Sequence, residues 1–406
     1  MAVIGFALLL LLPSLDIPLK YGGVAGMIGY LIAGLVGLTF AYYKLLPIVS
    51  VRLSENNALW ILLLTITVLA VFALVLYPIA NSGRFGGGTD VDDALIIGVT
   101  EIAAGRYPYY QQTYLGGLLS PMPGAILLSF PFVLSGLLPL QNIFWIGALS
   151  AAARTVFGSF KPALMIVLTV VLVSPTAYQV IAVGSDHMSN AIYILISMWL
   201  LVRAVANEGS SSWQRLFPAI LLGISLSSRS NFLVLTPILF SVLLQNSNWK
   251  VAARYCSIAA AVFLAVTIPF WLYDPPAFSP YLIQSGRLEN MRDVLPHAPI
   301  IVPAISFILA AAASLLRMGK DCAAFFRNCA VVQILILYIS SLPYAAHLGE
   351  FSLFLGNIGY GMFTVFFAAV SIWIYMSRTN ECLQCGSRES DPEAPVREEE
   401  DSHLAG

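Results

Sequence analysis

Long apolar runs separated by short polar breaks cover most of this 406-residue chain. A run of about 20 apolar residues is long enough to cross a bilayer as a helix. The runs therefore predict twelve transmembrane helices, near residues 2–19, 23–43, 59–79, 121–138, 162–183, 189–205, 214–228, 231–245, 254–273, 298–316, 327–346 and 351–376. One further run, 141–158, would make a thirteenth crossing.

Basic residues in the short loops predict the orientation of these helices, because Lys and Arg gather on the cytoplasmic side. If 141–158 does not cross the membrane, the following basic residues all lie on one side: Lys44, Arg52, Arg154, Lys161, Arg203, Arg215, Lys250, Arg254, Arg317, Lys320, Arg327 and Arg378. We therefore interpret 141–158 as an interfacial or re-entrant segment on the cytoplasmic face. Both termini are then cytoplasmic, and the loops 80–120, 184–188, 227–230 and 274–297 lie outside.

Composition agrees with an all-α polytopic membrane protein. Hydrophobic residues make up 59% of the chain and charged residues only 10%, against about 25% charged in soluble domains. The net charge of −1 gives no reason to expect nucleic acid as a partner. The acidic tail 377–406 is predicted to be disordered in the cytoplasm. Its Cys382-x-x-Cys385 lacks two further zinc ligands nearby, so a surface pair or an acylation site is the simpler interpretation.

The first outer loop begins with an unusual stretch, GGGTDVDD at residues 86–93. Asp90, Asp92 and Asp93 follow an uncharged helix almost at once. Thr89 and Asp92 fit a helix-capping pattern, and carboxylates favour helix N-termini. Three carboxylates exceed what capping needs. Neighbouring carboxylates raise one another's pKa, which suits a general base, or they can share a divalent cation.

The rest of that loop predicts an amphipathic helix at 92–104, lying on or beside the membrane surface, and then a group of tyrosines. Tyr107, Tyr109, Tyr110 and Tyr114 fall within eight residues. Tyrosines at such a position commonly anchor a protein at the interface. The alternative is a platform for a sugar ring or a lipid headgroup.

The order of these features resembles the polytopic type C glycosyltransferases, which use polyprenyl-phosphate sugars. The shared features are a helix, an outer-loop Asp, an amphipathic helix, Gly105–Tyr109 (GRYPY) and then an S-P-x-P start to the next helix. VGSDHMSN (183–190), SSRSNF (227–232) and IPFWLYDPPAFSP (268–280) resemble later outer loops of the family, so the matched pieces span residues 60–280. The likeness is greatest to the bacterial polyprenyl-phosphate-mannose-like branch.

The resemblance implies roles for particular residues. An outer-loop aspartate would activate the acceptor hydroxyl. Asp90 is the best match, with Asp92 and Asp93 as alternatives, and Asp186 matches the second acidic position. Arg229 and Asn231 would hold the donor phosphate, since an arginine fork binds phosphate at two points. His187 and Arg287 are further phosphate-binding candidates, and Tyr107, Tyr109 and Tyr110 would contact the substrate. No cofactor is required beyond an optional divalent cation.

We therefore expect an integral membrane glycosyltransferase of a bacterial inner membrane, with a polyprenyl-phosphate sugar as donor and a glycan or glycolipid as acceptor. Its expected divisions are an N-terminal helical hairpin (1–58), a catalytic membrane module (59–280), C-terminal helices (281–376) and the tail. Two alternatives stay open. A transporter or flippase would place ionisable residues deep in its helices, and a non-catalytic scaffold would keep the fold without the activity.

Overall fold

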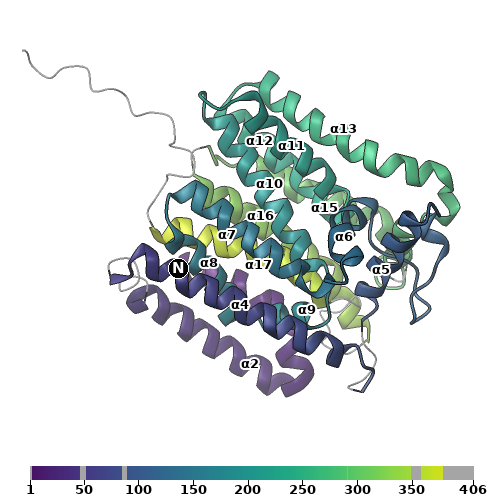
Figure 1. Cartoon of the computed structure of the whole chain (residues 1–406), viewed down its shortest axis with the longest axis horizontal. Coiled ribbons are helices and arrows are strands. Elements are labelled where there is room, and N and C mark those ends of the chain that lie inside the picture. The colour runs from purple at the N-terminus through teal and green to yellow at the C-terminus, as the bar shows by residue number, and fades with distance from the viewer. Residues whose placement is uncertain are drawn as a thin grey trace, which may run out of the picture.

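The computed structural model describes residues 2–45, 52–84, 89–289, 291–319, 321–348 and 358–377, and helices dominate it (Figure 1). Within those ranges the only β pairing is an isolated bridge between Gln112 and Leu118. The α-helices are α1 Ala2–Leu11, α2 Asp16–Phe40, α4 Glu55–Ala80, α5 Val91–Ala103, α6 Pro123–Leu134, α7 Gln141–Phe157, α8 Phe160–Val173, α9 Pro175–Ala182, α10 His187–Ala206, α11 Ser212–Leu226, α12 Thr236–Asn246, α13 Trp249–Tyr273, α14 Ser279–Glu289, α15 Ala298–Ser314, α16 Cys322–Leu348 and α17 Met362–Ser377.

Short 3-10 turns connect several of these helices: η1 Leu12–Ser14, η3 Pro108–Tyr110, η4 Leu138–Leu140, η5 Ser230–Leu235, η6 Pro275–Ala277 and η7 Ile358–Gly361. A π-helical turn, η2 Ala41–Leu45, follows α2. Five of the described helices are long and apolar enough to cross a membrane, namely α2, α4, α10, α13 and residues 322–342 of α16. The bent pair α8 and α9 passes the same test when taken together. The chain thus has the helices of a membrane-embedded, all-α protein.

The helices run back and forth between two ends of the bundle, named here by residues at either end of α10. The Asp186 end lies where α10 begins, and the Arg203 end lies where it finishes. At the Arg203 end, Arg203 donates to the carbonyl of Thr155 in the last part of α7. The Glu55 carboxylate, which begins α4, accepts from Ser159 and Phe160 at the start of α8. Both of these loops therefore lie away from Asp186.

The segments 121–138 and 141–158 form helices α6 and α7, which lie differently in the bundle. Helix α7 begins at the Asp186 end, where Asn142 donates to the carbonyl of Ser185 at 2.8 Å, and it finishes at the Arg203 end. Its 17 residues cover about 25 Å. Helix α6 instead lies across the Asp186 end, because it starts against Ser227 while its Phe132 packs on Phe144 in the first turn of α7. It packs against α5 (Figure 1).

Other boundaries also differ from the expected ones, and glycine or proline explains several of them. The run 162–183 bends by 90° between α8 and α9, where Pro175 cannot continue the hydrogen-bond ladder. The run 2–19 stops at Leu11 before Pro13, and α2 is kinked at Gly23, where φ is +59°. The run 351–376 becomes η7 and α17, while 349–357 and the tail 378–406 lie outside the described residues.

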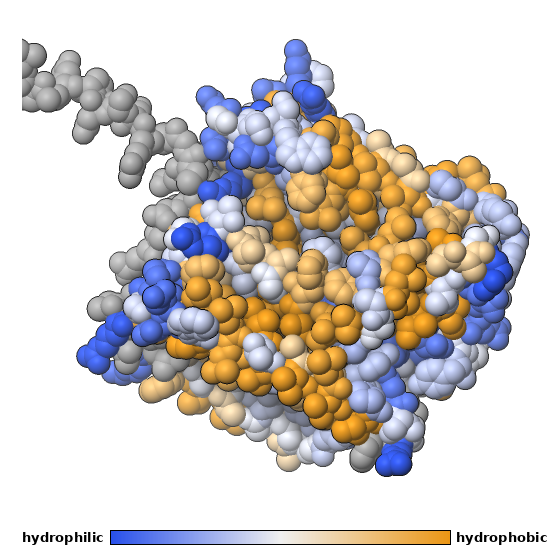
Figure 2. Space-filling view, in the orientation of Figure 1, coloured by the Kyte–Doolittle hydropathy of each residue, from blue (hydrophilic) through white to orange (hydrophobic). Residues whose placement is uncertain are grey.

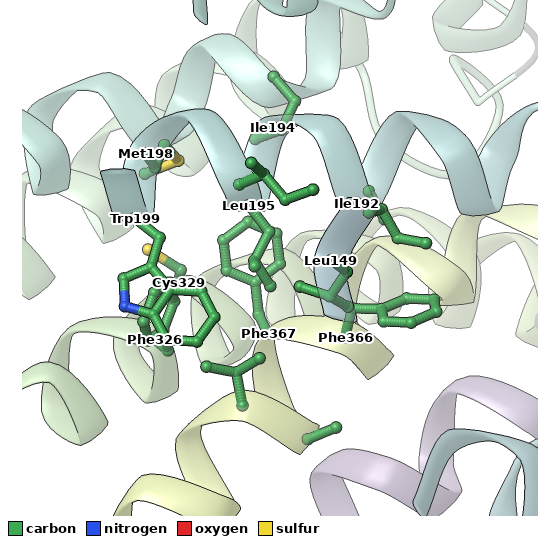
Figure 3. Packing of buried hydrophobic residues seen from close by; sticks show 14 of the residues in the cluster. Leu149, Ile192, Ile194, Leu195, Met198, Trp199, Phe326, Cys329, Phe366 and Phe367 are labelled. Carbon is green, nitrogen blue, oxygen red and sulfur yellow. The ribbon is translucent and has the colours of Figure 1, made fainter. Parts of the chain in front are cut away.

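The core lies around α10, where nine-tenths of the residues in the apolar stretch of the helix are buried. Trp199 of α10 packs edge-on to Phe326 of α16, with ring centroids 5.5 Å apart, and Phe366 and Phe367 of α17 are fully buried close by (Figure 3). Leu149 of α7 completes this layer (Figure 3). Within a bilayer, close packing of this kind holds helices together by van der Waals contact.

The surface carries the opposite pattern. Large apolar side chains of α2 and α4 are exposed, among them Val24, Ile32, Trp60, Leu64 and Val71. Hydrophobic residues cover the middle of the visible face, and hydrophilic ones gather toward its margins (Figure 2). This distribution is what lipid contact around the waist of the bundle requires. The expected divisions of the chain at 58, 280 and 376 stay predictions.

Candidate functional site

A buried ion pair joins two loops that lie 43 positions apart in the chain. Arg229 Nη2 donates to Asp186 Oδ1 at 2.8 Å. Neither side chain is more than 5% exposed. Burial alone would raise the pKa of Asp186, but the adjacent guanidinium overcomes it and holds that pKa below its ordinary value. The carboxylate is therefore ionised at neutral pH, and the two charges offset each other.

Asp186 is fixed from a second side as well. Its other oxygen, Oδ2, accepts from Asn190 Nδ2 at 3.1 Å, one turn along α10. The Tyr193 hydroxyl in turn donates to the side-chain oxygen of Asn190. Gly184 has a φ of +68°, a conformation that glycine adopts at little cost, and this turn places Asp186 at the N-cap of α10. Both carboxylate oxygens are thus occupied in the described structure.

Arg229 sits against the start of α6. Its Nη1 donates to Ser120 Oγ at 3.3 Å. The S-P-x-P stretch that begins with Ser120 is docked by main-chain bonds, since Gly124 N donates to the carbonyl of Ser227 at 2.8 Å. A Cβ at Gly124 would lie 2.2 Å from the carbonyl oxygen of Ile224, so glycine is required for this approach. The S-P-x-P and SSRS motifs are therefore one structural unit.

A small cavity of about 150 Å³ opens beside Arg229. Among the described residues that line it, Arg229 is the only charged one. The others are Ser120, Met122, Ser230, Asn231, Phe278, Pro280, Tyr281, Ile283, Gln284 and Tyr360. The Nε of Arg229 is buried and has no hydrogen-bond partner within the described ranges. Arg229 thus places one cation at the cavity and has one donor without a partner.

A larger, mostly apolar cavity of about 340 Å³ adjoins the first. The two share the lining residues Ser230, Asn231, Gln284 and Tyr360, so they are neighbours. The apolar cavity lies between η5, α14, α15, α16 and α17, and its apolar lining consists of Leu233, Val234, Leu288, Val302, Pro303, Phe307, Ile336, Leu337 and Phe363. Together the cavities present one cation, Arg229, beside a largely apolar lining.

The three loop aspartates accept hydrogen bonds from different partners, although the charge of Asp93 contributes to raising the pKa of Asp92. Asp90 Oδ2 accepts from the Thr113 hydroxyl at 2.6 Å, while its Oδ1 accepts no hydrogen bond from the described residues. Asp93 Oδ2 accepts from the backbone N–H of Tyr114 at 2.8 Å. The N-cap of α5 is Asp90, with no side-chain capping bond, so the capping pattern expected from Thr89 and Asp92 is wrong.

Asp92 hydrogen-bonds to the end of α4. Its Oδ2 accepts from the Tyr77 hydroxyl at 2.8 Å and from Asn81 Nδ2 at 2.9 Å. Its Oδ1 is buried without a partner in the described part of the chain. Burial raises the pKa of Asp92 above its ordinary value, although the hydrogen bond from Tyr77 opposes the shift. Asp92 lies beside Gly184, and so close to the Asp186 loop.

A short loop also connects Asp90 to the ion pair. A Cβ at Gly117 would lie 2.8 Å from Asp90 Oδ2. Gly117 is three residues before Ser120, a chain reach of at most about 11 Å. Asp90 itself lines neither cavity. The structure thus brings Asp186 and Arg229 into direct contact, and connects Asp90 and Asp92 to them through one loop each.

His187 lies next to the ion pair but outside the cavities. Its Nδ1 is 2.5 Å from Ser185 Oγ and 3.8 Å from Asp186 Oδ1. The ring stacks on Phe363, with centroids 5.7 Å apart, and meets Tyr360 edge-on at 5.0 Å. His187 therefore packs behind the two cavity residues Tyr360 and Phe363.

The tyrosines of the first outer loop join it to the end of α13. Tyr107 donates to the carbonyl of Phe270 at 2.9 Å, and Tyr110 donates to Asp274 at 2.8 Å. The buried Tyr109 donates to the carbonyl of Pro121 at 3.1 Å and packs on Phe278, a cavity residue. They support the cavity wall and do not line it.

Of the remaining phosphate candidates, Asn231 lines both cavities. Arg287 falls within α14, and its side chain lies outside the described part of the structure. Sequence reasoning missed the cavity residues Ser120, Gln284 and Tyr360. Ser120 begins the recognised S-P-x-P motif, and Tyr360 follows the glycines of GNIGYG, which interrupt a long apolar run.

No group of three or more His, Cys, Asp or Glu side chains in the described residues is arranged to hold a metal ion. Comparisons with protein-family models, with characterised proteins and with solved structures found no match to this chain. The likeness to type C glycosyltransferases therefore stays a prediction, and the case for a function depends on the site.

Proposed function

We propose that the chain is a membrane glycosyltransferase, which transfers a sugar from a polyprenyl-phosphate donor to an acceptor hydroxyl at the extracytoplasmic face. The observation that carries the proposal is the pair of neighbouring cavities: a small one beside the buried Arg229 cation, and a larger one with no charged residue in its described lining. A lipid-phosphate sugar has the matching parts in the same order. Carboxylates are connected to this cation through a short loop, and the proposed reaction needs both kinds of group.

The same proposal places the bundle in the membrane. Helices α1, α2, α4, α7, the bent pair α8–α9, α10, α11, α12, α13, α15, α16 and α17 would cross, twelve in all. Helices α5 and α6 would lie at the outer surface. The Arg203 end would face the cytoplasm of a bacterial inner membrane, because Arg154, Lys161, Arg203 and Arg215 lie in the helix turns next to its loops. Both termini would be cytoplasmic.

In the proposed reaction the acceptor oxygen attacks the anomeric carbon, and the bond from that carbon to the phosphate oxygen breaks. The products are the glycosylated acceptor and the polyprenyl phosphate. Asp90 would take the acceptor proton, since Thr113 holds one of its oxygens and the other accepts no bond from the described residues. Arg229 would stabilise the charge on the departing phosphate.

The test uses purified protein in lipid nanodiscs with a panel of polyprenyl-phosphate sugars and candidate acceptors. We expect release of free polyprenyl phosphate by the unaltered protein, and a loss of at least a hundredfold in Asp90→Asn and Arg229→Ala. Glu208→Gln is the matched control, because Glu208 is exposed in the loop after α10 at the Arg203 end. Unchanged release in Asp90→Asn and Arg229→Ala would contradict the proposed roles. Uptake of donor into sealed vesicles without release would favour a flippase instead.

A further inference from the structure

The small cavity has an unusual balance of charge. Arg229 is its only charged lining residue within the described ranges, and Asp186 offsets that charge from directly behind. A phosphate bound to the free side of the guanidinium would lie about 5–7 Å from the Asp186 carboxylate, since both would contact one planar group. The ligand therefore meets a pair whose formal charge is zero.

The side chain of Asp186 cannot easily move away when an anion binds beside Arg229. The carboxylate is fully buried, and its two oxygens are held by Arg229 and Asn190. Asn190 is itself held by Tyr193. No second described cation lines the cavity to neutralise a further charge. Each additional negative charge on a ligand is thus opposed by a fixed carboxylate in a site of low polarity.

We infer that this cavity selects a singly charged lipid phosphodiester over a doubly charged lipid phosphate monoester, and that Asp186 sets this preference. The inference rests on the proposed function and extends it, because the donor sugar phosphate is a diester with one charge and the released polyprenyl phosphate is a monoester. A monoester carries close to two charges above its second pKa of about 6. The cavity would thus hold the donor and expel the product.

Asp186 is then a positioning residue that acts through Arg229. It keeps the guanidinium in the cavity wall and limits the ligand charge that the cavity accepts. Removing its charge would strengthen product binding, so Asp186→Asn would be inhibited by polyprenyl phosphate at concentrations that leave the unaltered protein active. A carboxylate that only stabilised the fold would alter the binding of both ligands equally.

The test measures binding and needs no turnover. A short-chain prenyl phosphate and its methyl ester are titrated into the nanodisc-embedded protein at pH 8, with Asp186→Asn and the control Glu208→Gln alongside. We expect the methyl ester to bind at least tenfold more tightly than the monoester to the unaltered protein. In Asp186→Asn we expect that preference to fall to about threefold or less, or to reverse. Equal binding of the two ligands, or an unchanged preference in Asp186→Asn, would overturn the inference.

A pH titration of the unaltered protein tests the same idea without a substitution. Between pH 8 and pH 5.5 the monoester loses one charge and the methyl ester does not, so only the monoester should bind more tightly at low pH. The titratable and charged groups facing the pair are His187 and Tyr193 of α10, Tyr109 of η3 and Tyr360 of η7. Because histidines commonly titrate near pH ~6.5, His187→Gln repeats the titration. A pH effect that disappears in His187→Gln would overturn the inference.

Two further ligands separate failure of the inference from failure of the proposed function. Dimethyl phosphate carries the diester charge without the chain, and we expect it to bind at least a hundredfold more weakly than the methyl prenyl ester. Comparable binding of dimethyl phosphate would contradict a lipid ligand. Binding of neither prenyl ligand would count against the proposed function itself. Binding of both prenyl ligands without discrimination would contradict only the charge preference.

Discussion

Gly184 lies against Asp92: a Cβ at Gly184 would be 3.5 Å from the Cβ of Asp92 and 2.5 Å from the Tyr77 ring. This contact joins the first outer loop to the loop that carries Asp186. The two loops are more than ninety positions apart in sequence. Their contact brings Asp92 close to the loop whose Asp186 pairs with Arg229.

Replacing Gly184 by Ala tests how far the site depends on this contact. The positive φ makes Ala cost about 1 kcal/mol, and the clash with Tyr77 adds to that and moves the Asp186 loop. We expect a lower melting temperature and at least a tenfold loss of donor turnover. Gly136→Ala is the control, because Gly136 has a φ of +69° but nothing within 4 Å. Similar effects on turnover in both variants would show that backbone conformation alone matters.

Stability should depend on pH through Asp92. Its folded-state pKa is raised above the ordinary value of 3.8, so the folded state favours the protonated form. Below pH 3.8 the carboxyl is neutral in both states, and the raised pKa causes no loss of stability. As pH rises from there toward the raised pKa, the unfolded state ionises first. The folded state then loses up to about 1.4 kcal/mol per pH unit.

Asp92→Asn cannot titrate, so its melting temperature should rise relative to the unaltered protein as pH increases through that window. Above the raised pKa the difference should stay constant. Thermal melts in nanodiscs between pH 4 and pH 8 measure this. Asp93→Asn is the control, since it removes a carboxylate from the same helical turn. Among the described residues, that carboxylate accepts a hydrogen bond only from the Tyr114 N–H. A difference between Asp92→Asn and the unaltered protein that does not change with pH would contradict the prediction.

Breaking the buried Asp186–Arg229 pair should lower the stability of the protein more than replacing both residues with apolar ones. Arg229→Met leaves Asp186 buried and unpaired, so we expect it to lower the free energy of unfolding by about 3–5 kcal/mol. The double variant with Asp186→Leu should recover most of that stability while remaining inactive in donor turnover. Denaturation and turnover measured on all three variants separate the two roles of Arg229. Recovery of activity in the double variant would show that the pair is only structural.

Sequence patterns predicted the helical class, the helix α5 and the shared side of the Asp186 and Arg229 loops. They did not predict the pairing of those two residues, because hydrophobic periodicity fixes a loop's side and not its contacts. The sequence pattern predicts one cluster of three aspartates, yet successive residues of a helix point about 100° apart. Asp92 and Asp93 therefore reach different partners. Tertiary contacts bring Ser120 and Tyr360 to the cavity, and no local sequence pattern predicts such contacts.

The segments 121–138 and 141–158 show a second limit. Both runs are apolar and of similar length, so hydropathy alone could not decide which one crosses. The deciding contacts are tertiary: Asn142 with Ser185 at one end of α7 and Thr155 with Arg203 at the other. Counting basic loops predicts twelve crossings, the number in the proposed arrangement, but it assigns one of them to 121–138 where that arrangement assigns it to α7.

Cysteine labelling tests this exchange directly. Ser135 is exposed just after α6, and Ser210 lies in the loop after α10 at the Arg203 end. If α6 lies across the outer surface, Ser135→Cys should react with a membrane-impermeant maleimide added to intact cells, and Ser210→Cys should react only after lysis. Tyr114→Cys, in the first outer loop, is the positive control. The unaltered chain gives the background from its five native cysteines. If Ser135→Cys behaved like Ser210→Cys, α6 would be the crossing helix, and α7 would be the cytoplasmic segment that the positions of the basic residues predict.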